Sequence, residues 1–170
     1  MKKIVFIGFA ACYKSSVGKL VADTLNLEFC DTDSEIERLS NLTITNIFEQ
    51  YGEQVFRDKE NLLLNNLKDR KNIVISCGGG SVLSSNFGEF VANGTVVWLT
   101  ASVDTVLSRL GAVSRPLFDG LTRSQLSDFI LQLNPVYAQY ADICINTDDL
   151  SSAEVAQRAL TELKSKSTIL

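Results

Sequence analysis

The chain has 170 residues, of which 45% are hydrophobic and 21% are charged, so we expect a single folded domain over residues 1–170. Its formal net charge of −4 argues against a general nucleic-acid binder, because a polyanion is held mainly by lysine and arginine. The chain contains no histidine, which excludes histidine-dependent catalytic triads and histidine-ligated zinc. A catalytic base therefore has to be a carboxylate, a lysine, a tyrosine or a thiolate.

Cysteine spacing and hydropathy favour a cytoplasmic protein. The four cysteines are far apart and form no C-x-x-C pair, so we expect reduced thiols. Gly8 and Lys14 interrupt the first apolar run too early for a signal peptide. No stretch reaches the roughly 18 apolar residues of a membrane span, and we expect no membrane partner.

Short apolar runs rich in β-branched residues alternate with longer amphipathic stretches. This pattern is typical of βαβ units around a parallel sheet that is buried on both faces. The predicted strands are residues 3–7, 27–30, 72–76, 95–99 and 142–145. The predicted helices are residues 15–25, 33–39, 44–69 with a break near Gly52, 84–92, 103–110, 123–137 and 152–164. The turn-rich stretch at about residues 111–122 is predicted to be a lid.

A motif close to a phosphate-binding loop follows the first predicted strand. Residues 8–15 read Gly-Phe-Ala-Ala-Cys-Tyr-Lys-Ser, near the pattern G-x-x-x-x-G-K-[ST]. Such a loop points backbone N–H groups and a lysine at a polyphosphate, while its hydroxyl binds magnesium. Tyr13 stands where the pattern has a glycine, and its ring takes space that glycine leaves free. Taken alone, an ordinary strand-to-helix turn with a solvated Lys14 explains this loop equally well.

Polar and small residues follow the next two predicted strands. Asp31 and Asp33 end the second strand, and a run of three glycines at residues 78–80 follows the third. Ligands of open α/β sheets bind at these carboxyl ends. One carboxylate can support hydrated magnesium while the other accepts a proton from a substrate hydroxyl, although helix capping explains each aspartate by itself better. The glycine run favours close approach to a ligand, with a tight turn as the alternative.

Two arginines are further candidates for binding an anion. Arg57 lies in a predicted helix, where its guanidinium can form a fork on a substrate carboxylate or a surface ion pair. Arg115 lies in the predicted lid and can close over a transferring phosphoryl group. Each arginine taken singly favours the surface interpretation.

Together, these residues resemble the shikimate kinase family along almost the whole chain. The matching pieces are Ile-Gly-Phe at residues 7–9 with Lys14-Ser15, Asp31-Thr32-Asp33, Phe56-Arg57 with Glu60, Gly78-Gly79-Gly80, Arg115-Pro116-Leu117, and Pro135 with Tyr137. The resemblance implies an α/β, three-layer P-loop kinase fold, in which a five-stranded parallel sheet of order 2-3-1-4-5 carries helices on both faces and a lid loop. It also implies a substrate-binding helical region at about residues 33–60.

The function implied by this resemblance is the ATP-dependent phosphorylation of the shikimate 3-hydroxyl in the biosynthesis of chorismate and aromatic amino acids. Mg²⁺ is the implied cofactor, and ATP or ADP and a small carboxylated polyol such as shikimate are the implied ligands of a monomer. The implied catalytic residues are Asp33, Lys14 and Arg115. The implied nucleotide-binding residues are Ala11, Cys12, Tyr13, Lys14, Ser15, Ser16, Arg109 and Arg115. The implied metal ligands are Ser15 and Asp31, and the implied substrate-binding residues are Asp33, Arg57, Gly78, Gly79 and Gly80.

Three positions depart from the family pattern. Ala11 and Tyr13 replace glycines of the phosphate loop, and Leu133 replaces an arginine that helps the family bind the substrate carboxylate. These departures leave two alternatives open, namely a related kinase with another hydroxyl substrate and a catalytically impaired paralogue that only binds ligands. From the steric argument alone, we expect Tyr13→Gly to raise nucleotide affinity.

Overall fold

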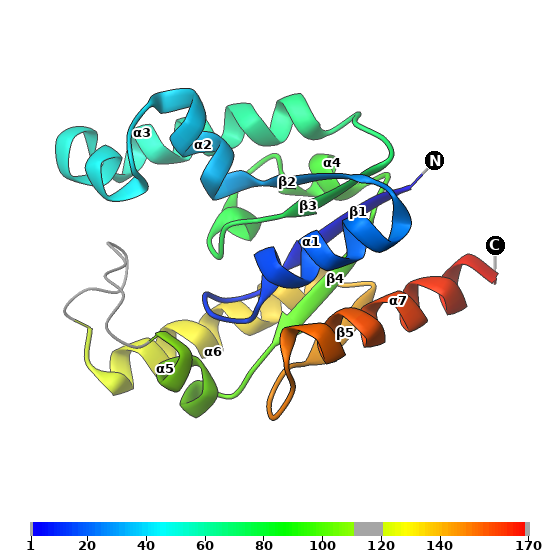
Figure 1. Cartoon of the computed structure of the whole chain (residues 1–170). Coiled ribbons are helices and arrows are strands. Elements are labelled where there is room, and N and C mark those ends of the chain that lie inside the picture. The colour runs from blue at the N-terminus through cyan, green and yellow to red at the C-terminus, as the bar shows by residue number, and fades with distance from the viewer. Residues whose placement is uncertain (1, 111–120, 169–170) are drawn as a thin grey trace.

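A parallel five-stranded sheet runs through the middle of the molecule (Figure 1) in this computed structural model, which describes residues 2–110 and 121–168. The strands are β1 (Lys3–Ile7), β2 (Glu28–Asp31), β3 (Ile73–Ser76), β4 (Thr95–Thr100) and β5 (Ile143–Asn146). Their spatial order is β2-β3-β1-β4-β5, which confirms the predicted topology. In the central strand, Val5 is paired with Ile75 on one side and Val96 on the other.

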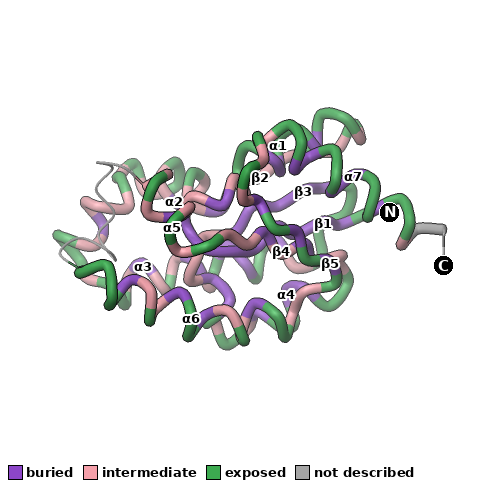
Figure 2. Tube along the Cα trace, turned by 90° about the horizontal axis from the view of Figure 1, so that it is seen from below, coloured by how far each residue is buried: buried purple, intermediate pink, exposed green. Residues whose placement is uncertain are grey.

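Helices cover both faces of the sheet and form the outer two layers (Figure 2). One face carries α1 (Lys14–Leu25) and α7 (Ser152–Thr168), and the other carries α3 (Ile44–Leu67), α4 (Phe87–Val91) and α6 (Arg123–Tyr140). The remaining helices are α2 (Thr32–Ser40), α5 (Val103–Leu110) and the short 3₁₀ helix η1 (Ser81–Leu83). Because both faces are covered, every residue of β1 and β3 is buried, as expected from their continuous apolar sequences.

Most predicted elements agree with the structure within one to four residues, and the predicted break in α3 is confirmed by the non-helical φ of 81° at Gly52. The helix predicted at residues 84–92 is wrong at its start, because residues 84–86 lie between η1 and the shorter helix α4. The side-chain oxygen of Asn61 on α3 accepts a hydrogen bond from the Ser84 hydroxyl. The backbone carbonyl of Asn61 accepts one from the side-chain amide of Asn86, 3.0 Å away. These contacts with α3 hold the segment outside the helix.

No helix within residues 2–110 and 121–168 is both long and apolar enough to cross a bilayer.

Candidate active site

A cavity of about 550 Å³ opens at the carboxyl ends of β1, β2 and β3, where ligands of open α/β sheets bind. Its walls are the loop between β1 and α1, the first turns of α2, part of α3, the residues after β3 and the end of α5. The predicted site residues that border it are Ala11, Cys12, Tyr13, Lys14, Ser15, Ser16, Asp31, Asp33, Arg57, Gly78, Gly79, Gly80 and Arg109. Arg115 and most of the predicted lid lie outside the described residues.

The loop between β1 and α1 has a backbone conformation that favours glycine at several positions. Gly8 has a φ of 140°, and a Cβ built there would lie 2.2 Å from the carbonyl oxygen of Leu99, so only glycine fits. Ala11 and Tyr13 have φ values of 61° and 65°, in the left-handed region that costs an L-residue roughly 1–2 kcal/mol. The loop thus keeps this backbone conformation although two of its residues are not glycines.

The N-terminus of α1 faces this cavity without a side-chain cap. Tyr13 is the N-cap residue, its side chain makes no capping hydrogen bond, and the first turn holds no acidic residue. The Lys14 ammonium donates a hydrogen bond to the Phe9 carbonyl, 2.7 Å away, across the loop. The first N–H groups of a helix, the positive end of its dipole and a lysine together make an anion site.

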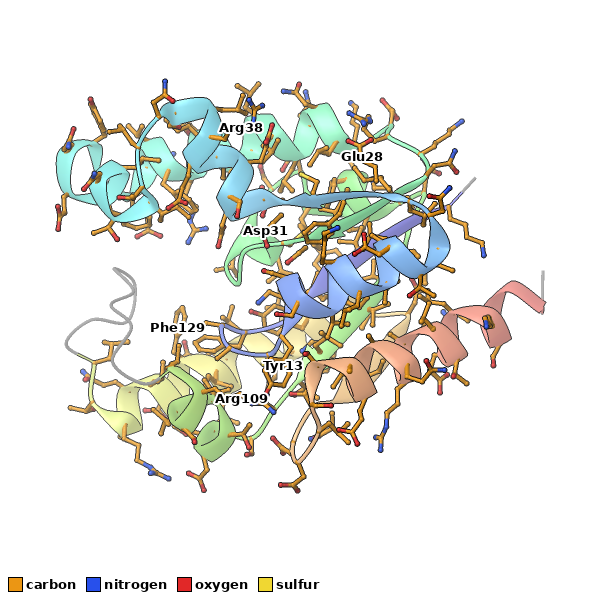
Figure 3. The ribbon with its side chains drawn as sticks, in the orientation of Figure 1. Tyr13, Glu28, Asp31, Arg38, Arg109 and Phe129 are labelled. Atoms are coloured by element: carbon orange, nitrogen blue, oxygen red, sulfur yellow. The ribbon has the colours of Figure 1, made fainter. Side chains whose placement is uncertain are left out.

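The ring of Tyr13 lies against Arg109 of α5 (Figure 3). The guanidinium carbon is 4.0 Å from the ring centroid, within the range of a cation–π contact. Arg109 also donates hydrogen bonds to the hydroxyl and the carbonyl of Thr147, at 2.8 and 2.6 Å, and to the Ala11 carbonyl at 3.3 Å. The tyrosine ring is therefore part of a contact that joins the loop, α5 and the residue after β5.

Asp31 has two partners, one for each carboxylate oxygen. Its Oδ1 accepts a hydrogen bond from the Ser34 N–H at 3.1 Å and caps α2, while its Oδ2 accepts one from the Ser15 hydroxyl at 2.5 Å. The Ser76 hydroxyl lies 3.4 Å from that of Ser15. The predicted capping role of Asp31 is thus present, and its other carboxylate oxygen is hydrogen-bonded to the second predicted metal ligand, Ser15. A hydroxyl and a carboxylate are hard oxygen ligands, which Mg²⁺ accepts together with phosphate oxygens and water, so these residues fit the ion.

The glycine run after β3 is held by side chains from two distant elements. The Gly78 N–H donates a hydrogen bond to the Thr32 hydroxyl at 3.0 Å, and the Tyr137 hydroxyl of α6 donates one to the Gly79 carbonyl at 2.6 Å. Thr32 is completely buried and Tyr137 is 1% exposed. The run is therefore a rigid wall of the cavity.

The absence of side chains in this run makes room for two charged groups. A Cβ at Gly78 would lie 2.6 Å from Oδ1 of Asp33, and a Cβ at Gly80 would lie 2.7 Å from Nη2 of Arg57. The carboxylate and the guanidinium therefore lie directly against the glycine backbone. The run therefore allows close approach of two side chains of the chain itself, while close approach to a ligand stays a prediction.

Arg57 forms an ion pair with the buried carboxylate of Glu60. Its Nη1 donates to Oε2 of Glu60 at 2.8 Å, and the Glu60 side chain is 2% exposed. The other oxygen of Glu60 accepts a hydrogen bond from the Ser81 hydroxyl at 2.6 Å. A second acid, Glu53, contacts Arg57 at 3.2 Å from the exposed side. Arg57 thus lies at the cavity wall and forms ion pairs with both an exposed and a buried glutamate, and its role as a carboxylate ligand stays a prediction.

Burial disfavours three of the candidate bases near the cavity. Burial raises the pKa of Cys12 and raises the pKa of Cys77 well above its ordinary value. Burial likewise raises the pKa of Tyr137. All three groups are protonated near neutral pH, because desolvation penalises their charged forms. This leaves Asp33, which borders the cavity, as the candidate base predicted from the sequence.

Several residues that border the cavity were not singled out from the sequence. They are Ser34, Glu37, Thr45, Phe48 and Ser76. The position of Glu37 one turn after Asp33 is the only signal that could have pointed to one of them. Leu133, in contrast, is 4% exposed and belongs to the hydrophobic core.

Comparisons with known proteins agree with this geometry. A model of the shikimate kinase family matches residues 10–164. A shikimate kinase from Colwellia psychrerythraea is 36% identical over 166 residues, covering 95% of this chain and 96% of the relative. Shikimate kinase 1 from Yersinia enterocolitica is 36% identical over 168 residues, covering 96% and 97% of the two chains.

A solved structure extends the similarity to three dimensions. The shikimate kinase from Acinetobacter baumannii in complex with shikimate has a TM-score of 0.92 and 34% identity, and the match covers 98% of this chain and 94% of that one. The chain belongs to the shikimate kinase family of ATP-dependent P-loop kinases.

Proposed function

We propose that the chain transfers the γ-phosphoryl group of ATP to the 3-hydroxyl of shikimate. The observation that carries this proposal is that one cavity joins the phosphate loop to the end that holds Asp33 and Arg57. A donor phosphate and an acceptor hydroxyl can therefore meet in a single cavity. The related enzyme from Acinetobacter baumannii, whose structure contains shikimate, supports this acceptor.

At the donor end, the backbone N–H groups of residues 11–16 and the Lys14 ammonium would bind the β- and γ-phosphates. Ser15 and Asp31 would hold Mg²⁺, which when bound neutralises negative charge on the phosphates. Arg115 would close over the phosphates from the lid. This arrangement lowers the barrier by positioning and by stabilising charge, because phosphoryl transfer needs little covalent help from the protein.

At the acceptor end, Arg57 would bind the carboxylate of the acceptor, and the glycine backbone at residues 78–80 would contact its ring. Asp33 would accept the proton of the 3-hydroxyl as its oxygen attacks the γ-phosphorus. The bond between that phosphorus and the β,γ-bridging oxygen breaks, and ADP leaves. Asp33 is suited to this step because it lies against Gly78, beside the wall that faces the acceptor.

Leu133 favours a second candidate, a kinase that acts on another small hydroxyl compound. Among the described residues that border the cavity, the basic side chains are Lys14, Arg57 and Arg109. The acceptor end thus has Arg57 where the family pattern has two arginines. Loss of a charge-assisted hydrogen bond from an arginine weakens carboxylate binding by about 1.5–3 kcal/mol, or roughly 10- to 150-fold, unless another group replaces it.

An assay of ADP release over a panel of acceptors separates the two candidates. We expect turnover with shikimate and ATP, and a product heavier by one phosphoryl group in mass spectrometry. Gluconate and simple alcohols are the comparison substrates. Turnover with gluconate or a simple alcohol and none with shikimate would contradict the proposal that shikimate is the acceptor.

The setting proposed for this reaction is the cytoplasm, where ATP and Mg²⁺ are available. We further propose that the chain acts as a monomer, which the molar mass measured by light scattering tests.

Tyr137→Phe is expected to loosen the glycine run at residues 78–80, which borders the cavity, without removing a catalytic group. The change leaves the half-buried Gly79 carbonyl without its donor, and we expect stability to fall by about 1 kcal/mol, the lower end of the range for an unsatisfied acceptor. We expect a several-fold rise in KM for shikimate and a smaller change in KM for ATP. Urea unfolding and steady-state kinetics check both effects, and Tyr140→Phe on the same helix is the control. An unchanged unfolding midpoint would contradict this role of the hydroxyl.

A further inference from the structure

The ring of Tyr13 is directed at Arg109 (Figure 3) and borders the same cavity. A ring directed into the phosphate space would block the loop, which was the basis for expecting Tyr13→Gly to raise affinity. The structure changes this expectation. The loop keeps the left-handed backbone at residue 13, and the ring lies beneath a guanidinium instead.

The choice of residue at this position is unusual within the chain itself. The described non-glycine residues with positive φ are Ala11, Tyr13, Asn26, Asn41, Asn72 and Asp149. Asparagine and aspartate tolerate the left-handed region because their short polar side chains bond locally. Tyrosine has no such advantage, so its contact with Arg109 is the compensating interaction that the structure displays at this site.

Arg109 is held in place from three directions. Its hydrogen bonds run to two oxygens of Thr147 and to the Ala11 carbonyl, all roughly in the plane of the guanidinium as these groups donate in that plane. The guanidinium carbon also lies over the Tyr13 ring, 4.0 Å from its centroid. A guanidinium fixed in this way presents a planar, charged surface at the border of the cavity, and planar rings stack on such surfaces.

We infer that Tyr13 is a positioning residue for the nucleotide base. Its ring fixes the orientation of the Arg109 guanidinium, so that the base of ATP stacks on a group that is ordered before the nucleotide binds. The inference rests on the proposed function, since it deepens the nucleotide-binding role of Arg109. It predicts that Tyr13 contributes to binding of the base and contributes little to binding of the phosphates.

Titration calorimetry on the full chain with magnesium tests this, using ATP and inorganic tripolyphosphate as the two probes. Tyr13→Asn removes the ring but keeps a residue that tolerates the backbone conformation, and Tyr13→Gly removes the strain as well. We expect both variants to bind ATP about 3- to 10-fold more weakly, in line with loss of a cation–π contact. Tripolyphosphate has no base, so its affinity should change less than about 2-fold.

Conservative and remote variants provide the controls. Tyr13→Phe keeps the ring and should stay within about 2-fold of the unmodified chain for ATP. Tyr51→Asn changes an exposed tyrosine on α3 that does not border the cavity and should leave both affinities unchanged. In steady-state kinetics, the loss in Tyr13→Asn should appear in KM for ATP and much less in kcat. Thermal unfolding of each variant establishes that it is folded.

A double-mutant cycle with Arg109→Ala locates the effect. In the Arg109→Ala variant, Tyr13→Asn should weaken ATP binding less than about 2-fold, because the guanidinium that the ring would position is absent. Equal losses for ATP and tripolyphosphate, full additivity with Arg109→Ala, or tighter ATP binding by Tyr13→Gly would overturn the inference. ATP binding as expected but no transfer to shikimate would overturn the proposed function alone. A chain that binds no ATP would overturn both.

Discussion

Asp33→Asn is expected to lower kcat by about 10²- to 10⁴-fold, the range for loss of a positioned general base. The amide has nearly the shape of the carboxylate, so it still fits against Gly78, where a Cβ would lie 2.6 Å from Oδ1. It cannot accept the proton of the acceptor hydroxyl. Burial protonates Cys12, Cys77 and Tyr137 by raising the pKa of each, so these groups do not take over the role.

Single-turnover kinetics and calorimetry separate this chemical loss from a binding loss. The Asp33→Asn variant should bind ATP with magnesium as the unmodified chain does, and most of the loss should fall in the rate of phosphoryl transfer. Asp23→Asn is the matched control, since Asp23 is an exposed residue on α1 that pairs with Lys19. A kcat within about 3-fold of the unmodified chain for Asp33→Asn would rule out the general-base assignment.

Arg57→Met is expected to have two effects of different origin. The substitution leaves the Glu60 carboxylate, with a side chain 2% exposed, without its ionic partner. We expect stability to fall by about 3 kcal/mol, the lower end of the range for breaking a buried pair, because the Arg57 side chain is itself 22% exposed. Loss of the guanidinium should also weaken binding of shikimate by roughly 10- to 150-fold.

A second substitution tells these two effects apart. Arg57→Met combined with Glu60→Gln removes the uncompensated charge and keeps an acceptor for the Ser81 hydroxyl, so stability should recover while shikimate affinity stays low. Glu53→Gln is the control on the exposed side of Arg57 and should change stability by less than about 1 kcal/mol. Urea unfolding and shikimate titration provide the measurements. Recovery of shikimate affinity in the double variant would refute the assignment of Arg57 as the carboxylate ligand.

The fold was largely predictable because its central strands β1, β3 and β4 are mainly apolar runs and amphipathic helices separate the strands. The break at Gly52 was predictable too, since glycine adopts the positive φ found there. The segment at residues 84–92 was misjudged because its sequence allows a helix, while the hydrogen bonds of Ser84 and Asn86 to Asn61 come from another element. Local propensity carries no information about such a partner.

The candidate site was predictable as a set of positions. Asp31, Asp33 and the glycine run follow parallel strands, whose carboxyl ends meet at one edge of the sheet. Their individual contacts were not predictable. Asp31 was weighed between capping and metal binding. In the structure one carboxylate oxygen caps α2 and the other accepts a hydrogen bond from Ser15, while metal binding by Asp31 stays a proposal.

By itself, the sequence determined the fold class, the strand order through the family resemblance and the edge of the sheet where the site lies. The tertiary structure decided what each side chain does there. It paired Arg57 with the buried Glu60, and it directed the Tyr13 ring to Arg109, 96 residues further along the chain. Hydrophobic periodicity and motif spacing report on neighbours in sequence, whereas these contacts join elements that only folding brings together. The same tyrosine that looks like a defect in the motif is thus a packed component of the site.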